Sequence, residues 1–215
     1  MERQGDYFQR VEECLFQSAE IKRQTALKCS NSIRNAAELI AETFRSGGKV
    51  LLCGNGGSAV DCQHMAAEFV SRVAKDFERP ALPALALTTD TSFLTAFSND
   101  CGFEGVFERQ VQALGRAGDL LLCISASGNS ANVIRAVKAA VKINMRTIVL
   151  TGSRGRLAGM AHIAISVPST DTQRIQETHL AIEHIVCELV ESMLFHKPDS
   201  LMATEVMIGR AHNDQ

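Results

Sequence analysis

Val50-Leu51-Leu52-Cys53 is followed at once by Gly54-Asn55-Gly56-Gly57-Ser58, and this stretch decides the fold class. A short apolar run bounded by glycine is typical of a strand that is buried on both faces, as in a parallel sheet. The pattern returns at Leu120-Leu121-Leu122-Cys123-Ile124, which leads into Ser125-Ala126-Ser127-Gly128-Asn129-Ser130. Helical spacing follows both turns. Strands that alternate with helices predict an α/β fold with a parallel sheet.

The rest of the chain continues this alternation. Helices are predicted over 59–72, 107–114, 131–142 and 171–195, and further strands over 85–87, 147–150 and 164–167. Residues 5–46 carry the spacing of two helices, and Gly47-Gly48 ends the second one. We expect a three-layer, doubly wound parallel sheet with an N-terminal helix. The domain occupies 31–197, after a helical segment over 1–30 and before a loose tail over 198–215.

Composition excludes several classes of function. The 215 residues carry a formal charge of −2, which gives no electrostatic case for binding nucleic acid or an anionic membrane. There is no Trp and one Tyr, so a platform for stacking bases is not expected. Seven scattered cysteines form no C-x-x-C pair, and no 18-residue apolar span or signal peptide is evident. These features predict a cytoplasmic protein.

The turn Ser125-Ala126-Ser127-Gly128-Asn129-Ser130 predicts an anion site. Ligands of open α/β folds collect at the carboxyl ends of the strands, where this turn lies. Backbone N–H groups at a helix start favour an anion, and three hydroxyls add donors. The turn has no Lys and does not match a P-loop, so a monophosphate on a small molecule fits better than a triphosphate. The alternative is an ordinary capped helix, with Ser127 or Asn129 as the N-cap.

The Gly54–Ser58 turn leads into a possible proton-transfer pair. Alone, Asn-Gly-Gly is explained by a tight turn that needs positive φ. His64 and Glu68 then lie four residues apart on one helix face, within an apolar run. Histidine titrates near neutral pH, so a His–Glu pair suits proton transfer. Such a pair is also common as a plain surface contact.

A second polar cluster lies on the C-terminal helix, at Gln176, Glu177, His179, Glu183 and His184. Its alternative interpretation is a solvent-exposed helix face, although interleaved apolar residues leave little room for one. Gln176 and His184 are roughly 12 Å apart along an ideal helix axis. They can therefore share one site only if their side chains lean together, the helix start is irregular, or a second subunit contributes one of them.

These motifs resemble those of the sugar isomerase (SIS) domain proteins, and among them the phosphoheptose isomerases. The resemblance covers about residues 30–195. It rests on CGNGGS at 53–58, QHMAAEF at 63–69, SND at 98–100, SASGNS at 125–130, and RIQETH at 174–179 with His184. The phosphate turn of the family often has Thr where this chain has Ala126. That change removes one hydroxyl but leaves the backbone N–H.

The resemblance implies conversion of sedoheptulose 7-phosphate to D-glycero-D-manno-heptose 7-phosphate through an enediol, for activated heptose biosynthesis. It assigns Glu68 as general base and His184 as acid. The substrate contacts that it implies are Asn55, Gly56, Gly57, Ser58, Glu68, Asn99, Asp100, Ser125, Ala126, Ser127, Ser130 and Gln176. Some members bind Zn²⁺, one per subunit, through a set that falls here on His64, Glu68, Gln176 and His184. The family is typically homotetrameric with active sites at subunit borders, which makes 1–30 a candidate assembly segment. A simple core role for this helix fits its pattern equally well.

Two alternatives remain open from sequence. A SIS relative is a non-catalytic adaptor of the bacterial replication initiator, but it lacks the Glu and the second His that this chain keeps as Glu68 and His184. An isomerase acting on another sugar phosphate is the other alternative, because nothing in the motifs measures the length of the substrate.

Overall fold

The computed structural model describes residues 3–73 and 77–195, so the predicted tail over 198–215 lies outside the described residues. The elements are α1 (Arg3–Arg45), β1 (Val50–Gly54), α2 (Gly57–Val70), β2 (Ala84–Ala86), α3 (Thr91–Cys101), η1 (Phe103–Gly105), α4 (Val106–Leu114), β3 (Leu120–Ser125), α5 (Ala131–Lys142), β4 (Arg146–Thr151), η2 (Leu157–Gly159), β5 (Ile163–Ser166) and α6 (Thr172–Phe195). Within these residues, no helix is both long and apolar enough to cross a membrane.

The five strands form one parallel sheet in the order β2-β1-β3-β4-β5. The chain passes from β1 to β2 on one side and then returns to β3 on the other side. The point where the strand order reverses therefore lies between β1 and β3. Ligands of open α/β sheets bind at the carboxyl ends of the strands at such a point. Both glycine- and serine-rich turns follow these two strands.

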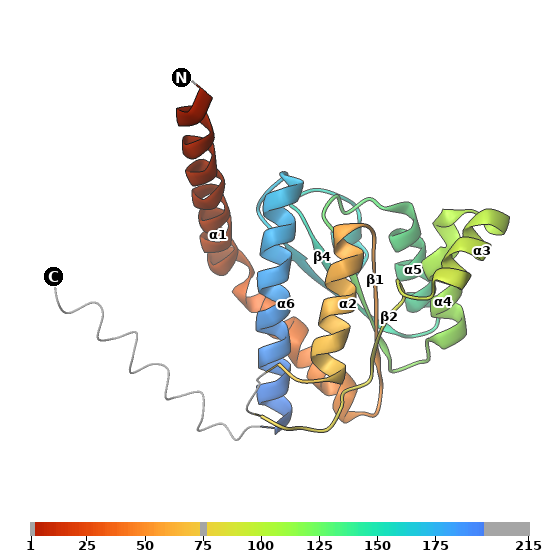
Figure 1. Ribbon diagram of the computed structural model, residues 1–215. Helices are drawn as coiled ribbons and strands as arrows, with labels where there is room; N and C mark the ends of the chain where they lie inside the picture. Colours follow the sequence, from red (N-terminus) through yellow and green to blue (C-terminus); the bar gives the residue numbers. More distant parts are fainter. Residues whose placement is uncertain (1–2, 74–76, 196–215) are drawn as a thin grey trace.

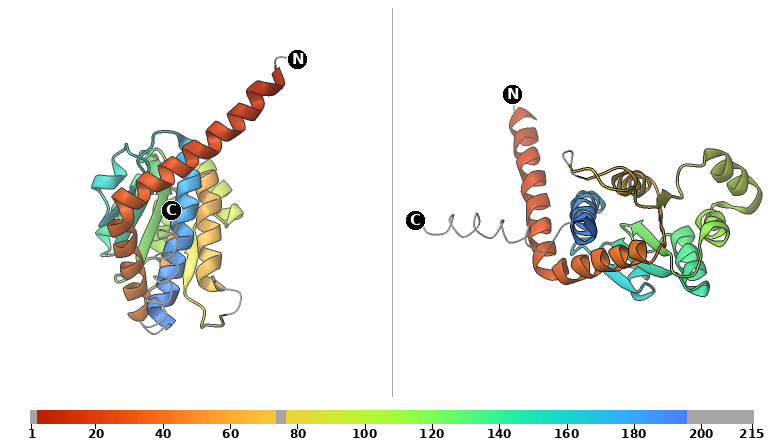
Figure 2. Two further views of the ribbon diagram at one scale, coloured as in Figure 1. Left: turned by 90° about the vertical axis from the view of Figure 1, so that its left-hand side faces the viewer. Right: turned by 90° about the horizontal axis from the view of Figure 1, so that it is seen from below.

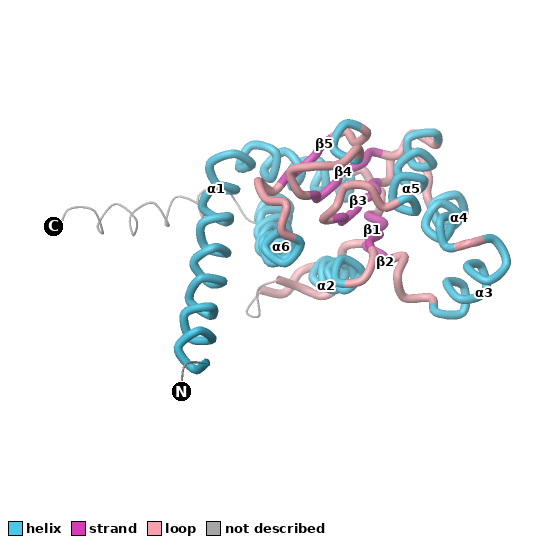
Figure 3. Tube along the Cα trace, turned by 90° about the horizontal axis from the view of Figure 1, so that it is seen from above, coloured by secondary structure: helices cyan, strands magenta, loops and turns pink. Residues whose placement is uncertain are grey.

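Helices cover both faces of the sheet (Figures 1 and 3), and alternate residues of each central strand belong to the cores on opposite faces. Leu52 and Leu122 join a core with α1, α2 and α6, whereas Leu51 and Leu121 join a second core with α4 and α5. Every residue of β1 and β3 is buried. This arrangement confirms the predicted three-layer α/β fold and explains the continuous apolar runs of both strands.

The N-terminal region is one helix rather than the two predicted. Figure 2 shows that α1 bends between an N-terminal part that projects from the body and a C-terminal part that packs on the domain. The hydroxyls of Thr25 and Ser30 donate to the carbonyls of Ile21 and Ala26 in the middle of the helix. Such bonds from a side chain to a carbonyl four residues earlier bend helices without breaking them.

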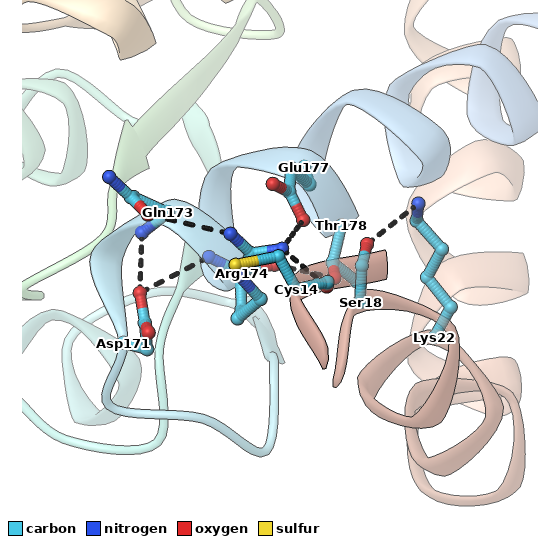
Figure 4. A network of polar contacts seen from close by, with 8 residues as sticks. All are labelled: Cys14, Ser18, Lys22, Asp171, Gln173, Arg174, Glu177 and Thr178. Carbon is cyan, nitrogen blue, oxygen red and sulfur yellow. Dashed lines mark hydrogen bonds and ion pairs between the residues drawn. The ribbon is translucent and has the colours of Figure 1, made fainter. Parts of the chain in front are cut away.

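Arg174 fastens the start of α6 to the projecting part of α1 (Figure 4). Its Nη1 donates to the Cys14 carbonyl at 2.7 Å and pairs with Glu177 at 3.0 Å. The Asp171 carboxylate accepts from the Gln173 N–H at 2.9 Å and so caps α6. Asp171 therefore marks where α6 begins, and Arg174 holds this helix start against α1.

The helix α3 was not predicted. Asp90 caps it by accepting from the Phe93 N–H at 2.9 Å. None of its residues is buried, although Phe93 and Phe97 stack on each other with ring centroids 5.3 Å apart. Because α3 buries no face, its sequence lacks the helical spacing of apolar residues that would predict it. Ser98, Asn99 and Asp100, the SND motif, lie at the end of α3.

Candidate active site

The turn after β1 is built by glycine. A Cβ at Gly54 would lie 2.6 Å from the Ser58 carbonyl oxygen and 2.9 Å from that of Ile124, so only glycine lets the two strand ends approach. Gly56 has φ 57° and precedes α2 as its N-cap without a side-chain cap. A Cβ at Gly57 would meet Gln176 Nε2 at 2.7 Å. The glycines thus bring the start of α2 against α6.

The serine hydroxyls in the turn after β3 do not cap the following helix, α5. Ser125 Oγ and Ser130 Oγ lie 3.1 Å apart. Ser130 is the N-cap of α5 but makes no side-chain cap, so the alternative interpretation, in which Ser127 or Asn129 is an ordinary N-cap, is wrong. Instead, Ser127 Oγ accepts from the Asn129 N–H at 3.2 Å within the turn. The serine hydroxyls are therefore not needed to start the helix.

The two turns and the start of α6 enclose a pocket of about 210 Å³. Seven predicted substrate contacts line it, which are Asn55, Ser58, Ser125, Ala126, Ser127, Ser130 and Gln176. Ile124 and Thr172 also line it and were not predicted. Thr172 follows Asp171, which caps α6. Its position at a helix start was the one feature of the sequence that could have predicted Thr172 as a pocket residue. The starts of α2, α5 and α6 all lie at this pocket, which favours an anion.

Asn132 is a further residue that sequence reasoning missed. Asn55 Nδ2 donates to Asn132 Oδ1 at 2.9 Å, and Asn132 Nδ2 donates to Asn55 Oδ1 at 2.8 Å. Asn132 is 3% exposed. This reciprocal amide pair joins the turn after β1 to the first turn of α5. It also occupies the side chain of Asn55, which leaves mainly the backbone of Asn55 for a ligand.

Three of the four predicted metal ligands come together between α2 and α6. His64 Nε2 lies 3.3 Å from His184 Nε2 and 3.9 Å from Glu68 Oε1. The two imidazole rings meet edge to face, with centroids 4.8 Å apart. The fourth predicted ligand, Gln176, lies against Gly57 instead. Within one chain, Gln176 and His184 therefore remain apart along α6, as the sequence indicated. Among the described residues, no group of three or more His, Cys, Asp and Glu side chains is arranged as a metal site.

Asn99 and Asp100 lie on α3, away from the residues that line the pocket. Asn99 Nδ2 donates to Asp100 Oδ1 at 2.9 Å, and both residues are exposed. Figure 3 places α3 beyond α4 and on the opposite side of the molecule from α1. A single chain therefore does not bring the SND motif to the rest of the candidate site.

Two buried ionisable groups of α6 lie beside the site. Glu183 is 1% exposed, and neither carboxyl oxygen has a hydrogen-bond partner among the described residues. Burial, with a smaller contribution from the charge of Asp61, raises the pKa of Glu183 to about 8. Burial lowers the pKa of His179 to about 4, although its Nε2 lies 3.3 Å from the Thr151 carbonyl oxygen. At neutral pH both side chains are therefore uncharged.

Comparison with known proteins first defines the class. The family model described as SIS domain matches residues 15–152. The parallel sheet, the paired turns after β1 and β3 and the pocket between them thus belong to a SIS-domain protein.

The particular family follows from full-length relatives. A phosphoheptose isomerase of Roseiflexus sp. (strain RS-1) is 55% identical over 84% of this chain and 91% of its own length. That of Aquifex aeolicus is 50% identical over 86% of this chain and 97% of its own. The solved phosphoheptose isomerase structure from Neisseria gonorrhoeae has a TM-score of 0.81 and 45% identity over 86% of this chain and 99% of that one. The chain belongs to the phosphoheptose isomerase family.

Proposed function

We propose that the protein is an aldose–ketose isomerase that converts sedoheptulose 7-phosphate to D-glycero-D-manno-heptose 7-phosphate, for activated heptose biosynthesis. The observation that carries this proposal is the placement of a hydroxyl-lined pocket and a His–Glu–His cluster along the same two helices, α2 and α6. The family membership of the chain supports the choice of substrate.

In this proposal the pocket holds the phosphate of the substrate. The hydroxyls of Ser125, Ser127 and Ser130 and the N–H groups at the starts of α2 and α5 donate to its oxygens. Gln176 and the backbone of Asn55 contact the sugar between the phosphate and the reacting carbons. The substrate is thereby held with C1 and C2 toward the His–Glu–His cluster.

Glu68 acts as the base that moves a proton between C1 and C2, and His184 exchanges protons with the two oxygens. The Glu68 side chain is 20% exposed, so a substrate can reach it from solvent. His64 lies beside its carboxylate and restricts its position on that side. Both groups sit on rigid helices rather than on loops. That placement limits their movement relative to the bound sugar.

We also propose one Zn²⁺ per subunit, held by His64, Glu68 and His184 with Gln176 as the fourth ligand. The described side chains of one chain are not arranged as a metal site, and Gln176 lies against Gly57, so the set would close when the ion binds or when a neighbouring subunit supplies Gln176. The two converging imidazole nitrogens beside a carboxylate support this, because such N and O donors suit Zn²⁺. When bound, the ion would stabilise negative charge on a substrate oxygen. We expect His184→Ala to lower the zinc content found by elemental analysis, whereas His162→Ala, at a histidine that contacts Thr147, keeps it.

We further propose a homotetramer in the cytoplasm, in which a neighbouring subunit brings Asn99 and Asp100 to the site. The exposed position of both residues on α3 supports a role toward another chain. The projecting α1 carries exposed Tyr7, Phe8, Val11, Leu15 and Phe16, which support an assembly role for residues 1–30. The described thiols are all unpaired, which accords with a reducing compartment.

The test is an isomerisation assay with sedoheptulose 7-phosphate, with and without Zn²⁺, followed by NMR. Conversion of this substrate with little conversion of fructose 6-phosphate is the expected result. Faster conversion of a shorter sugar phosphate would reassign the substrate. No conversion of either sugar would favour the adaptor alternative.

A further inference from the structure

A buried arginine links the two helices that carry the candidate catalytic residues. Arg79 follows α2 in the chain, and its side chain is 1% exposed. Its Nη2 donates to the Glu68 carbonyl at 2.7 Å and its Nη1 to the Phe69 carbonyl at 2.8 Å. Its Nε donates to Glu191 Oε2 at 2.6 Å. The guanidinium thus joins one helix end to a carboxylate on another helix.

For α2, this arginine completes the C-terminal end. The last four carbonyls of a helix have no partner within the helix, and a cation there also interacts favourably with the helix dipole. α2 ends at Val70 without a basic residue in its last turn. The Ala67 carbonyl accepts from the Ser71 N–H, and the Phe69 carbonyl also accepts from the Leu82 N–H. Arg79 supplies the charge from outside the helix and is the donor to the Glu68 carbonyl. One of the two carbonyls that it binds belongs to Glu68 itself.

For α6, the same contact lies on the helix face of the site. Glu191 is seven residues after His184, which is two turns or roughly 10 Å along the axis. Glu191 Oε2 also accepts from the Val73 N–H at 3.2 Å, so it holds the chain just beyond α2 as well. Phe69 and Val190, the chain neighbours of Glu68 and Glu191, belong to the buried core shared by α2 and α6.

We propose that Arg79 is a positioning residue that sets the distance between Glu68 on α2 and His184 on α6. This inference rests on the proposed function, because it assigns a role in the isomerisation. A buried ion pair is weak evidence of stability, since two well-packed apolar side chains often stabilise as well. The geometric role is different, because no apolar side chain can donate to the Glu68 carbonyl.

The test replaces both charges together, so that neither is left buried alone. We expect Arg79→Met/Glu191→Met to keep a cooperative thermal transition while kcat for sedoheptulose 7-phosphate falls by about tenfold or more. KM should stay within about twofold, because the phosphate pocket is formed by the other ends of the helices. Hydrogen exchange at residues 69–73 should become faster. Arg45→Met is the control, because Arg45 also donates to α6, at the Met193 carbonyl, but is exposed and makes no hydrogen bond or ion pair with α2 among the described residues.

Arg79→Lys provides a second variant if the double variant does not fold. Lysine keeps the charge but cannot donate to Glu68, Phe69 and Glu191 at once in the fixed directions of a guanidinium. We therefore expect the variant to fold and its kcat to fall. Unchanged kcat in a folded variant, or an equal fall in Arg45→Met, would overturn the assignment. An inactive wild type would overturn the proposed function and the positioning role of Arg79 with it. The exchange data would then show only whether Arg79 orders the end of α2.

Discussion

At the scale of the residue, Glu183 is the group whose surroundings least suit its charge. It is buried on α6 beside Asp61, Cys62 and Cys187, and both of its oxygens lack a hydrogen-bond partner among the described residues. Burying a carboxylate in this way is costly unless it takes up a proton. Burial disfavours the charged carboxylate and so raises the pKa of Glu183 to about 8.

This pKa predicts a pH dependence of stability. Between pH 4.5 and about 8 the unfolded state has released the Glu183 proton while the folded state keeps it. The unfolded state therefore binds fewer protons, and the free energy of unfolding falls as pH rises through this range. Glu183→Gln should remove this fall. Its advantage over the wild type should grow from pH 4.5 to 8 by a few kcal/mol.

Denaturant titrations in EDTA at several pH values measure this difference. Glu188→Gln is the matched control, because Glu188 is an exposed glutamate on the same helix and should change the pH profile little. His179 lowers stability as pH falls below 6.5, in the opposite direction, but it is present in all three proteins. Parallel pH profiles for wild type and Glu183→Gln would contradict the burial argument.

The serines of the pocket predict selectivity for phosphate. Ser125→Ala/Ser130→Ala removes two hydroxyls 3.1 Å apart without disturbing a helix cap. Each bond to a charged oxygen contributes about 1.5–3 kcal/mol, so KM for the phosphorylated sugar should rise by at least about tenfold. Ser71→Ala, at an exposed position after α2, should leave KM unchanged. An equal loss for dephosphorylated sedoheptulose would separate these serines from the phosphate.

At the scale of the element, the Asn55–Asn132 pair holds the turn after β1 against the first turn of α5. Asn132→Ala leaves the amide of Asn55 without its partner, which should lower the free energy of unfolding by about 1–3 kcal/mol and raise KM. Asn35→Ala, at an exposed position on α1, is the control. Steady-state kinetics and denaturant unfolding of both variants measure the effect. If Asn132→Ala matches the wild type in KM, the pair does not shape the site.

Elements also show what sequence could and could not predict. β1 and β3 were predictable because burial on both faces leaves unbroken apolar runs such as Leu51-Leu52 and Leu121-Leu122. The pocket was predictable because turns after neighbouring parallel strands lie at one edge. α3 was missed because no residue in it is buried, and the bend of α1 was read as a break. The link through Arg79 could not be predicted, since it joins residues 112 positions apart.

At the scale of the whole molecule, the projecting part of α1 predicts assembly. Phe8 is 70% exposed and Phe16 is 71% exposed on this helix. Phe16 also lines a mainly apolar pocket of about 430 Å³ with Ile21 and Arg174. We expect Phe8→Glu/Phe16→Glu to shift sedimentation from the proposed tetramer to smaller species, whereas Asn31→Glu, at an exposed polar position, does not. A wild-type monomer would contradict this prediction.

The proposed role of Glu68 is to transfer a proton between C1 and C2 of the bound heptose phosphate. The most direct measurement is NMR of the reaction of sedoheptulose 7-phosphate in D₂O with the wild type and with Glu68→Gln. We predict that the wild type forms heptose 7-phosphate with solvent deuterium at C2, and that folded Glu68→Gln loses several orders of magnitude in both turnover and exchange. Near-normal turnover or deuterium incorporation by Glu68→Gln would contradict this role of Glu68.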